Sequence, residues 1–147
     1  VIPGIDRFAQ EPEQFTLAVS LHSAQQAIRD ELMPQCTRWP LSDLKEALCS
    51  YVDKTNRRIS LEYLMIKNLN DTPHALQSLC DFADGLLSHI NLIPFNSVDH
   101  CSYQSSTEAT IIQFQKALTR VGIETTIRNS RGSDIAGACG QLKNKLR

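Results

Sequence analysis

The stretch ISLEYLMIKNLNDTPHALQSLCDFADGLLSHINLIPF, residues 59–95, determines the fold class. Its first part, Ile59 to Ile66, is a short run rich in large apolar residues, which is typical of a buried strand. Thr72 can cap a helix and Pro73 suits the first helical position, because proline has no N–H to leave unpaired. Ile90 to Phe95 predicts a second apolar strand. A strand, an amphipathic helix and another strand indicate a parallel α/β unit.

The same alternation continues upstream of this stretch. Phe15 to His22 predicts a strand buried on both faces, and Ser23 is placed to cap a short helix that continues to Leu32. A longer helix is predicted from about Pro40–Ser42 to Val52, because its apolar residues recur at steps of three and four.

Downstream, Ser105 and Glu108 have the spacing of a capping box, so a helix is expected to begin there and to end at Gly122. Residues 123–128 can form one more strand. Three clear strand–helix units do not close a barrel. The chain is therefore either a small open sheet or part of a larger barrel.

Composition places the chain among ordinary globular domains. It has 147 residues, 41% of them hydrophobic and 21% charged, with a formal net charge of −1. We find no apolar run of about 18 residues and no signal peptide. The net charge lacks the basic excess usual in RNA-binding domains, and we interpret the basic residues near the end as a solvated tail. Because the chain begins at Val1, we expect it to be a piece of a longer protein.

The five cysteines are too far apart for a zinc or iron–sulfur ligand set; they are Cys36, Cys49, Cys80, Cys101 and Cys139. Cys49 and Cys80 fall in predicted helices, where cysteine behaves as a small hydrophobic residue. Cys139 lies between Gly137 and Gly140, where the backbone can approach a ligand closely. Cys139 is therefore the best nucleophile candidate, although a lone cysteine is usually structural.

Polar residues at the ends of the predicted strands are the other candidates. Ser20 and His22 end the first strand, and Asn96 ends the third. Because active groups gather at the carboxyl ends of parallel strands, these residues form either a ligand rim or a set of loop-capping side chains. Glu62 lies within a strand, and an ion pair with Arg57 or Arg58 is the favoured interpretation.

Several blocks resemble the radical-SAM adenine methyltransferases of RNA, in the order and spacing of that family. The blocks are residues 18–24, 28–34, 56–63, 70–73, 91–96 and 131–135 with 138–142. The resemblance implies a partial (β/α)6 barrel, with this chain as its last three βα units plus a C-terminal extension. Residues 1–104 would be the C-terminal half of the barrel, and residues 105–147 a C-terminal helix, strand and catalytic-cysteine segment of the same continuous domain.

The resemblance also implies site residues and a reaction. Ser20, Leu21, His22 and Asn96 match positions that bind S-adenosyl-L-methionine (SAM), and Cys139 matches the cysteine that becomes S-methylated. In the family, one SAM methylates this sulfur. A second SAM is cleaved at a 4Fe-4S cluster to a radical, which activates the methyl group for addition to C2 of adenine. The implied partners are 23S rRNA and tRNA, and the protein is expected to be cytoplasmic, without a membrane, and monomeric when full length.

The chain departs from the family pattern in ways that leave alternatives open. It lacks the three-cysteine cluster motif and the second catalytic cysteine, which lie upstream in the family, so we expect no metal ligand here. Arg131 resembles the C2 group, whereas Ser133 is seen in a sister group that methylates C8. The alternatives are therefore C8 methylation or a binding remnant without catalysis. We expect the isolated chain to be inactive and poorly stable, because a barrel edge would be exposed.

Overall fold

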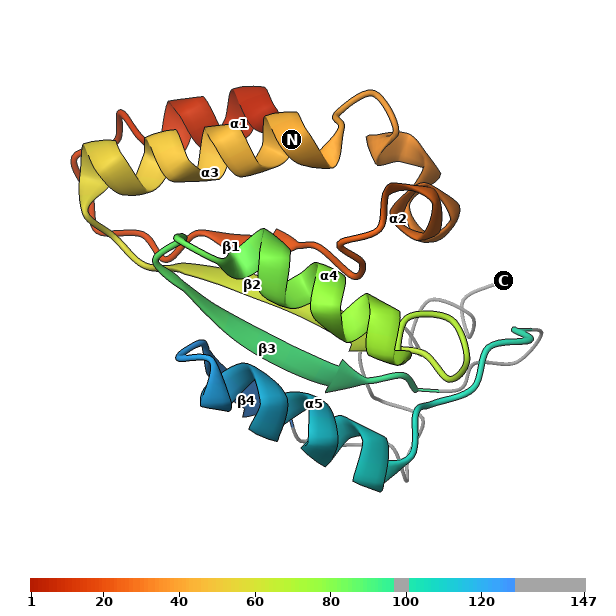
Figure 1. Ribbon diagram of the computed structural model, residues 1–147. Helices are drawn as coiled ribbons and strands as arrows, with labels where there is room; N and C mark the ends of the chain where they lie inside the picture. The colour runs from red at the N-terminus through yellow and green to blue at the C-terminus, as the bar shows by residue number, and fades with distance from the viewer. Residues whose placement is uncertain (97–100, 129–147) are drawn as a thin grey trace.

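A curved parallel sheet runs through the molecule, with helices packed along one side of it (Figure 1). The computed structural model describes residues 1–96 and 101–128. The sheet has four strands in the order β1-β2-β3-β4, and all neighbouring pairs are parallel. The strands are β1 (Ala18–Ser20), β2 (Ile59–Met65), β3 (Ser88–Pro94) and β4 (Glu124–Ile127).

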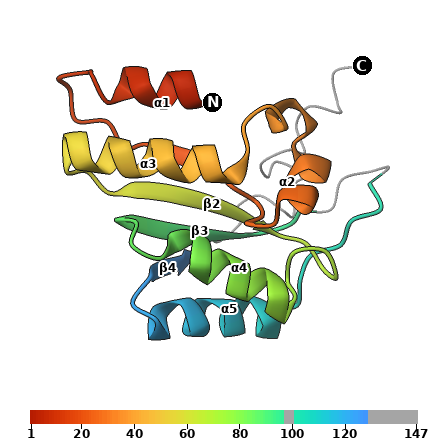
Figure 2. The same cartoon turned by 45° about the horizontal axis from the view of Figure 1, so that its top comes forward.

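All helices except the first connect successive strands. The helices are α1 (Ile2–Phe8), α2 (Gln26–Leu32), the short 3-10 helix η1 (Pro34–Cys36), α3 (Leu41–Thr55), α4 (Pro73–Ala83) and α5 (Glu108–Arg120). Because parallel crossovers are right-handed, α3, α4 and α5 cover the same face of the curved sheet. Figure 2 shows α3 next to β2, and α4 and α5 on the β3 and β4 side of the molecule. No helix within the described residues has the length and apolar character to cross a membrane.

The core lies between the sheet and these helices. Burial alternates along β2: Ile59, Leu61, Tyr63 and Met65 are buried, whereas the residues between them are only half-buried. The buried side chains pack with fully buried leucines of the helices, which are Leu44, Leu48, Leu79 and Leu118. One face of the sheet is therefore apolar and covered. We call the opposite face the open face; its residues include Ser20, Ser60, Glu62, Leu64, His89, Asn91, Ile93 and Thr126.

The structure confirms the α/β unit that the sequence predicted. Thr72 caps α4, since its side chain accepts a hydrogen bond from the Ala75 N–H at 3.1 Å. Gly122 follows α5 with a φ of +85°, a conformation that favours glycine. The additional strand that residues 123–128 were expected to allow is present as β4. It pairs with β3, so the sheet has four parallel strands rather than three.

Three local predictions are wrong. The first strand is shorter than residues 15–22, because Phe15 packs edge-to-face on Phe8 and only Ala18–Ser20 pairs with β2. Ser23 does not cap α2; its Oγ accepts from the Gln25 N–H at 3.0 Å within a turn before the helix.

The third error concerns the start of α5. Ser105 forms an isolated antiparallel bridge with Ile66 and is therefore not free to cap the helix. Thr107 takes this place and accepts from the Thr110 N–H at 3.2 Å. In addition, α1 was not predicted from the sequence at all.

Candidate functional site

Each strand contributes a polar side chain at the same level of the open face. The register places Ser20 beside Glu62, Glu62 beside Asn91, and Asn91 beside Thr126. The inner faces of parallel α/β barrels are usually filled by bulky branched side chains. A row of hydroxyl, carboxylate and amide groups instead indicates a surface for a polar ligand. We call these four residues the polar row.

Hydrogen bonds hold the carboxylate of Glu62 within the polar row. Its Oε1 accepts from Ser60 Oγ at 2.8 Å, and its Oε2 accepts from Asn91 Nδ2 at 2.9 Å. Thr126 Oγ1 in turn lies 3.4 Å from Asn91 Oδ1. Both oxygens of the carboxylate are therefore fixed by neighbours on the sheet.

The predicted ion pair of Glu62 with Arg57 or Arg58 is wrong. Arg58 pairs with Glu124, and Arg57 donates to the backbone carbonyl of Glu13 at 2.7 Å. Strand geometry explains the difference, because four residues of a strand span about 13 Å and thus separate Arg58 from Glu62.

A pocket of about 630 Å³ lies over Ser20, Glu62 and Asn91 of the polar row, near the carboxyl ends of the strands. This volume lies within the range of about 300–1,000 Å³ that is typical of small-molecule sites. Its lining residues are Ala18, Ser20, His22, Glu62, Leu64, Asn91, Ile93, Phe95, Asn96 and Arg128. Polar groups thus converge from several strands on one cavity that also has apolar walls.

The structure brings together most of the candidate residues. Ser20, His22 and Asn96 line the same pocket. Leu21 does not, because it faces the opposite side of the sheet and is 0% exposed within the core. Cys139 lies outside the described residues.

The backbone and side chain of His22 are both fixed. His22 has a φ of +56°, an uncommon conformation that histidine adopts more readily than most residues. Its Nδ1 accepts from the Leu64 N–H at 3.2 Å, so the proton of the neutral ring resides on Nε2. Burial lowers the pKa of His22, and the positive charge of Arg29 lowers it further, while the carboxylate of Glu62 opposes both effects. The net effect lowers the pKa of His22 below that of a free histidine and so favours the neutral ring.

Asn70, which the sequence placed in an ordinary loop, ties the ends of β1 and β2 together. Its buried side chain donates to the carbonyls of His22 at 2.7 Å and Leu64 at 2.5 Å, and it accepts from the Ile66 N–H at 2.8 Å. The hydroxyl of Tyr63 donates to the Asn70 carbonyl at 2.7 Å. Asn70 therefore sets the position from which His22 faces the pocket. An asparagine in the loop that follows an apolar strand is the only sequence signal for this role.

The neutral state of His22 predicts a pH dependence of stability. In the unfolded chain His22 takes up a proton near pH 6.5, whereas in the folded protein its pKa is lower. His22 should therefore lower the free energy of unfolding as the pH falls below about 6.5, and should have no such effect at higher pH. We expect His22→Asn to have a smaller loss of melting temperature between about pH 8 and about pH 5.5 than the unchanged full-length protein. Asparagine tolerates a positive φ and retains an acceptor for Leu64. Equal losses in the two proteins would contradict the assignment.

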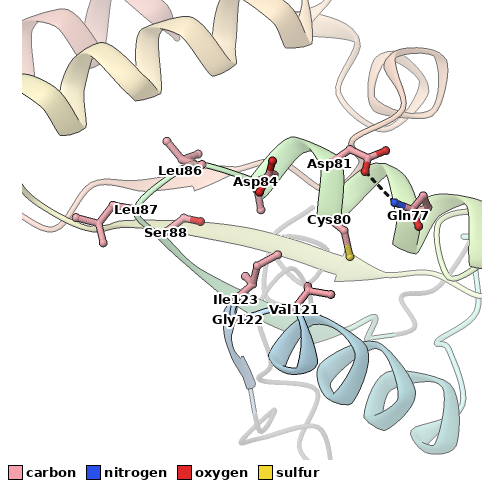
Figure 3. A pocket seen from close by; sticks show the side chains of 12 residues that line it. Gln77, Cys80, Asp81, Asp84, Leu86, Leu87, Ser88, Val121, Gly122 and Ile123 are labelled. Carbon is pink, nitrogen blue, oxygen red and sulfur yellow. Dashed lines mark hydrogen bonds between the residues drawn. The ribbon is translucent and has the colours of Figure 1, made fainter.

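A second hollow of about 530 Å³ lies at the other end of the sheet (Figure 3). The end of α4, the segment 84–88 and residues 121–123 surround it, and Gln77 donates to Asp81 at 2.8 Å on its wall. Ligand sites of parallel α/β proteins lie at the carboxyl ends of the strands, whereas this hollow lies beside the residues that begin β3 and β4. Burial also raises the pKa of the Cys80 thiol, which disfavours a reactive thiolate there. The pocket on the open face is the better candidate.

The described residues do not provide a site for an iron–sulfur cluster. Within residues 1–96 and 101–128, no group of three or more His, Cys, Asp or Glu side chains is arranged to hold a metal. The cysteines of this region are Cys36, Cys49, Cys80 and Cys101, all free and partly exposed, and none of them lines the pocket on the open face. The described lining of the pocket, with its hydroxyl, amide and apolar side chains, fits an organic ligand.

Comparison with known proteins relates the chain to RNA methyltransferases. The probable dual-specificity RNA methyltransferase RlmN of Caldanaerobacter subterraneus subsp. tengcongensis is 41% identical over 145 residues, which is 99% of this chain and 42% of that protein. The protein of the same name from Clostridium novyi is 42% identical over 143 residues, 97% of this chain and again 42% of the relative. No family model matches the chain.

Solved structures agree with this relationship. A radical SAM methyltransferase from Sphaerobacter thermophilus superimposes with a TM-score of 0.94 and 40% identity, over 97% of this chain and 42% of that one. A domain of pyruvate-formate lyase-activating enzyme from Bacteroides vulgatus has a TM-score of 0.66 at 19% identity, over 86% and 74% of the two chains, and shows the shared fold alone. The α/β sheet is thus part of a TIM-like radical SAM barrel. Although it spans only about 42% of the length of its relatives, the chain matches the RlmN family of radical SAM RNA methyltransferases in both sequence and fold.

Proposed function

We propose that the protein containing this chain is a SAM-dependent radical methyltransferase. It adds a methyl group to C2 of an adenine in 23S rRNA, and in tRNA, through an S-methylcysteine formed at Cys139. The observation that carries the proposal is the convergence of Ser20, His22 and Asn96 on one pocket at the strand ends. The relatives are named as dual-specificity RNA methyltransferases, which supports RNA as the substrate.

The pocket has the groups that SAM requires. The hydroxyl of Ser20 and the amide of Asn96 can both donate and accept hydrogen bonds. Nδ1 of His22 is occupied by Leu64, so Nε2–H is the ring group left to donate. Ile93 and Phe95 provide apolar walls for an adenine ring and for methylene groups. When bound, SAM supplies an activated methyl group on a sulfonium centre.

Further groups belong to the whole protein rather than to the described residues. The described residues do not fit a 4Fe-4S cluster, and the family resemblance assigns its cysteine ligands to sequence upstream of Val1. We also propose that the whole protein is a cytoplasmic monomer that acts without a membrane.

Product analysis tests the proposal. The full-length protein is expressed in a host whose own adenine methyltransferase gene is deleted, and 23S rRNA and tRNA are digested to nucleosides for mass spectrometry. We expect C2-methyladenosine in both RNAs. C8-methyladenosine would instead assign the sister reaction, and the absence of both nucleosides would favour a binding protein without catalysis.

A further inference from the structure

Glu62 is the one carboxylate among the described residues that line the pocket on the open face, and the family resemblance gives it no role. It lies on β2 between Ser20 and Asn91 of the polar row, three residues before the strand ends at Met65. Its carboxylate therefore lies deeper along the strand direction than His22 and Asn96, which follow the ends of their strands. A ligand that reaches Ser20 also reaches this carboxylate.

Counting hydrogen bonds shows that the carboxylate is only half satisfied by the protein. A carboxylate offers about four lone-pair sites. Ser60 fills one on Oε1 and Asn91 fills one on Oε2. Among the described residues no other side chain donates to Glu62, and the only ion pair in this part of the chain joins Arg58 to Glu124. Each oxygen thus retains one site for a donor.

A ligand that fills the pocket covers these remaining sites and excludes water from them. Covering a charged group without replacing its hydrogen bonds is costly, so the ligand must bring donors of its own. Two hydroxyl groups on adjacent carbon atoms suit two acceptor oxygens that belong to a single carboxylate. Acidic side chains bind ribose hydroxyls in this way in dinucleotide-binding folds.

We propose that Glu62 is a binding residue for the vicinal diol of a nucleoside, the ribose 2′- and 3′-hydroxyls of SAM. This inference rests on the proposed function, because that function supplies the adenosyl ligand. Ser60 and Asn91 fix both carboxylate oxygens before the ligand arrives, so little side-chain entropy is lost on binding. The role explains why a charged residue occupies the middle of β2, with no cationic partner in the described part of the chain.

The test compares hydroxyl removal from the ligand with charge removal from the protein. Calorimetry measures the affinity of the full-length protein and its Glu62→Gln variant for S-adenosylhomocysteine and for its 2′-deoxy and 3′-deoxy analogues. In the unchanged protein, each lost hydroxyl should weaken binding about tenfold, as expected for a bond to a charged group. The Glu62→Gln variant should bind S-adenosylhomocysteine about tenfold more weakly, or worse, than the unchanged protein. Its affinity for either deoxy analogue should be no more than about twofold lower than its affinity for S-adenosylhomocysteine.

Controls separate this role from general damage. Glu46→Gln makes the same change on the exposed side of α3 and should leave all three affinities unchanged. Glu62→Asp keeps the charge but moves it away from the ligand, because aspartate is one methylene group shorter. Its affinity for S-adenosylhomocysteine should lie between those of the unchanged protein and Glu62→Gln. The role of Glu62 would be overturned if the affinity losses from the Glu62→Gln change and from hydroxyl removal were additive, or if Glu62→Gln left the affinity unchanged. Either result would leave the proposed function intact. Failure of the unchanged protein to bind S-adenosylhomocysteine would overturn both.

Discussion

Replacing Cys139 with alanine in the full-length protein should remove C2-methyladenosine from both 23S rRNA and tRNA. The proposed route requires a sulfur that accepts a methyl group, and alanine has no nucleophilic atom. No cysteine in residues 1–96 or 101–128 lines the pocket on the open face, so none of them can substitute for Cys139. The measurement is nucleoside mass spectrometry of RNA from a deletion host. Peptide mass spectrometry should also find an extra methyl on Cys139 in the active protein.

Cys80→Ala is the matched control for this prediction. Cys80 is partly buried on α4, on the side of the sheet away from the pocket, and burial raises the pKa of its thiol. A thiol of this kind is a poor nucleophile, because the thiolate is the reactive form. The Cys80→Ala protein should therefore retain methylation. Persistence of C2-methyladenosine in the Cys139→Ala strain would exclude the proposed intermediate.

The strand–helix alternation was predictable because each element is set by local patterns. The run from Ile59 and the Thr72–Pro73 helix start both occur where the sequence placed them. The short β1 and the helix α1 were not predictable, because they depend on contact between Phe8 and Phe15 across a loop. The side on which α2 packs was not predictable either, because Arg29 is buried, with its guanidinium 3.4 Å from the Trp39 carbonyl, whereas Ala27 is exposed.

The site was predictable to the extent that strand ends could be located. Ser20, His22 and Asn96 share a pocket because they end or follow neighbouring parallel strands. Prediction of the polar row would have required the strand register, which no single segment of the sequence reveals. For the same reason, the sequence assigned Glu62 to the wrong partners. The side chain of Asn70 bonds to a residue 48 positions away in the sequence, so the sequence alone could not show this contact.

Asn70→Ala is expected to cause the largest loss of stability among the predicted substitutions. Alanine leaves the carbonyls of His22 and Leu64 and the N–H of Ile66 without the partners that Asn70 provides. Asn70 is 0% exposed, so water cannot readily replace these bonds. At about 1–3 kcal/mol for each buried group left unsatisfied, three groups would cost at least about 3 kcal/mol. Because single substitutions seldom cost more than about 5 kcal/mol, we expect a loss of about 3–5 kcal/mol in the free energy of unfolding. Thermal melting of the full-length protein measures the change.

Asn68→Gly provides a matched control in the same turn. Asn68 is exposed and has a φ of +61°, which glycine adopts without strain, so its melting temperature should stay close to that of the unchanged protein. Asn70→Asp keeps an acceptor for Ile66 but cannot donate to the two carbonyls, so it should melt well below the control. If Asn70→Asp melts like Asn68→Gly, the two donated bonds do not hold the strand ends together. Another contact would then have to fix the position of His22. The side chain of Asn70 joins the His22 carbonyl to the Leu64 carbonyl of β2 through these two bonds.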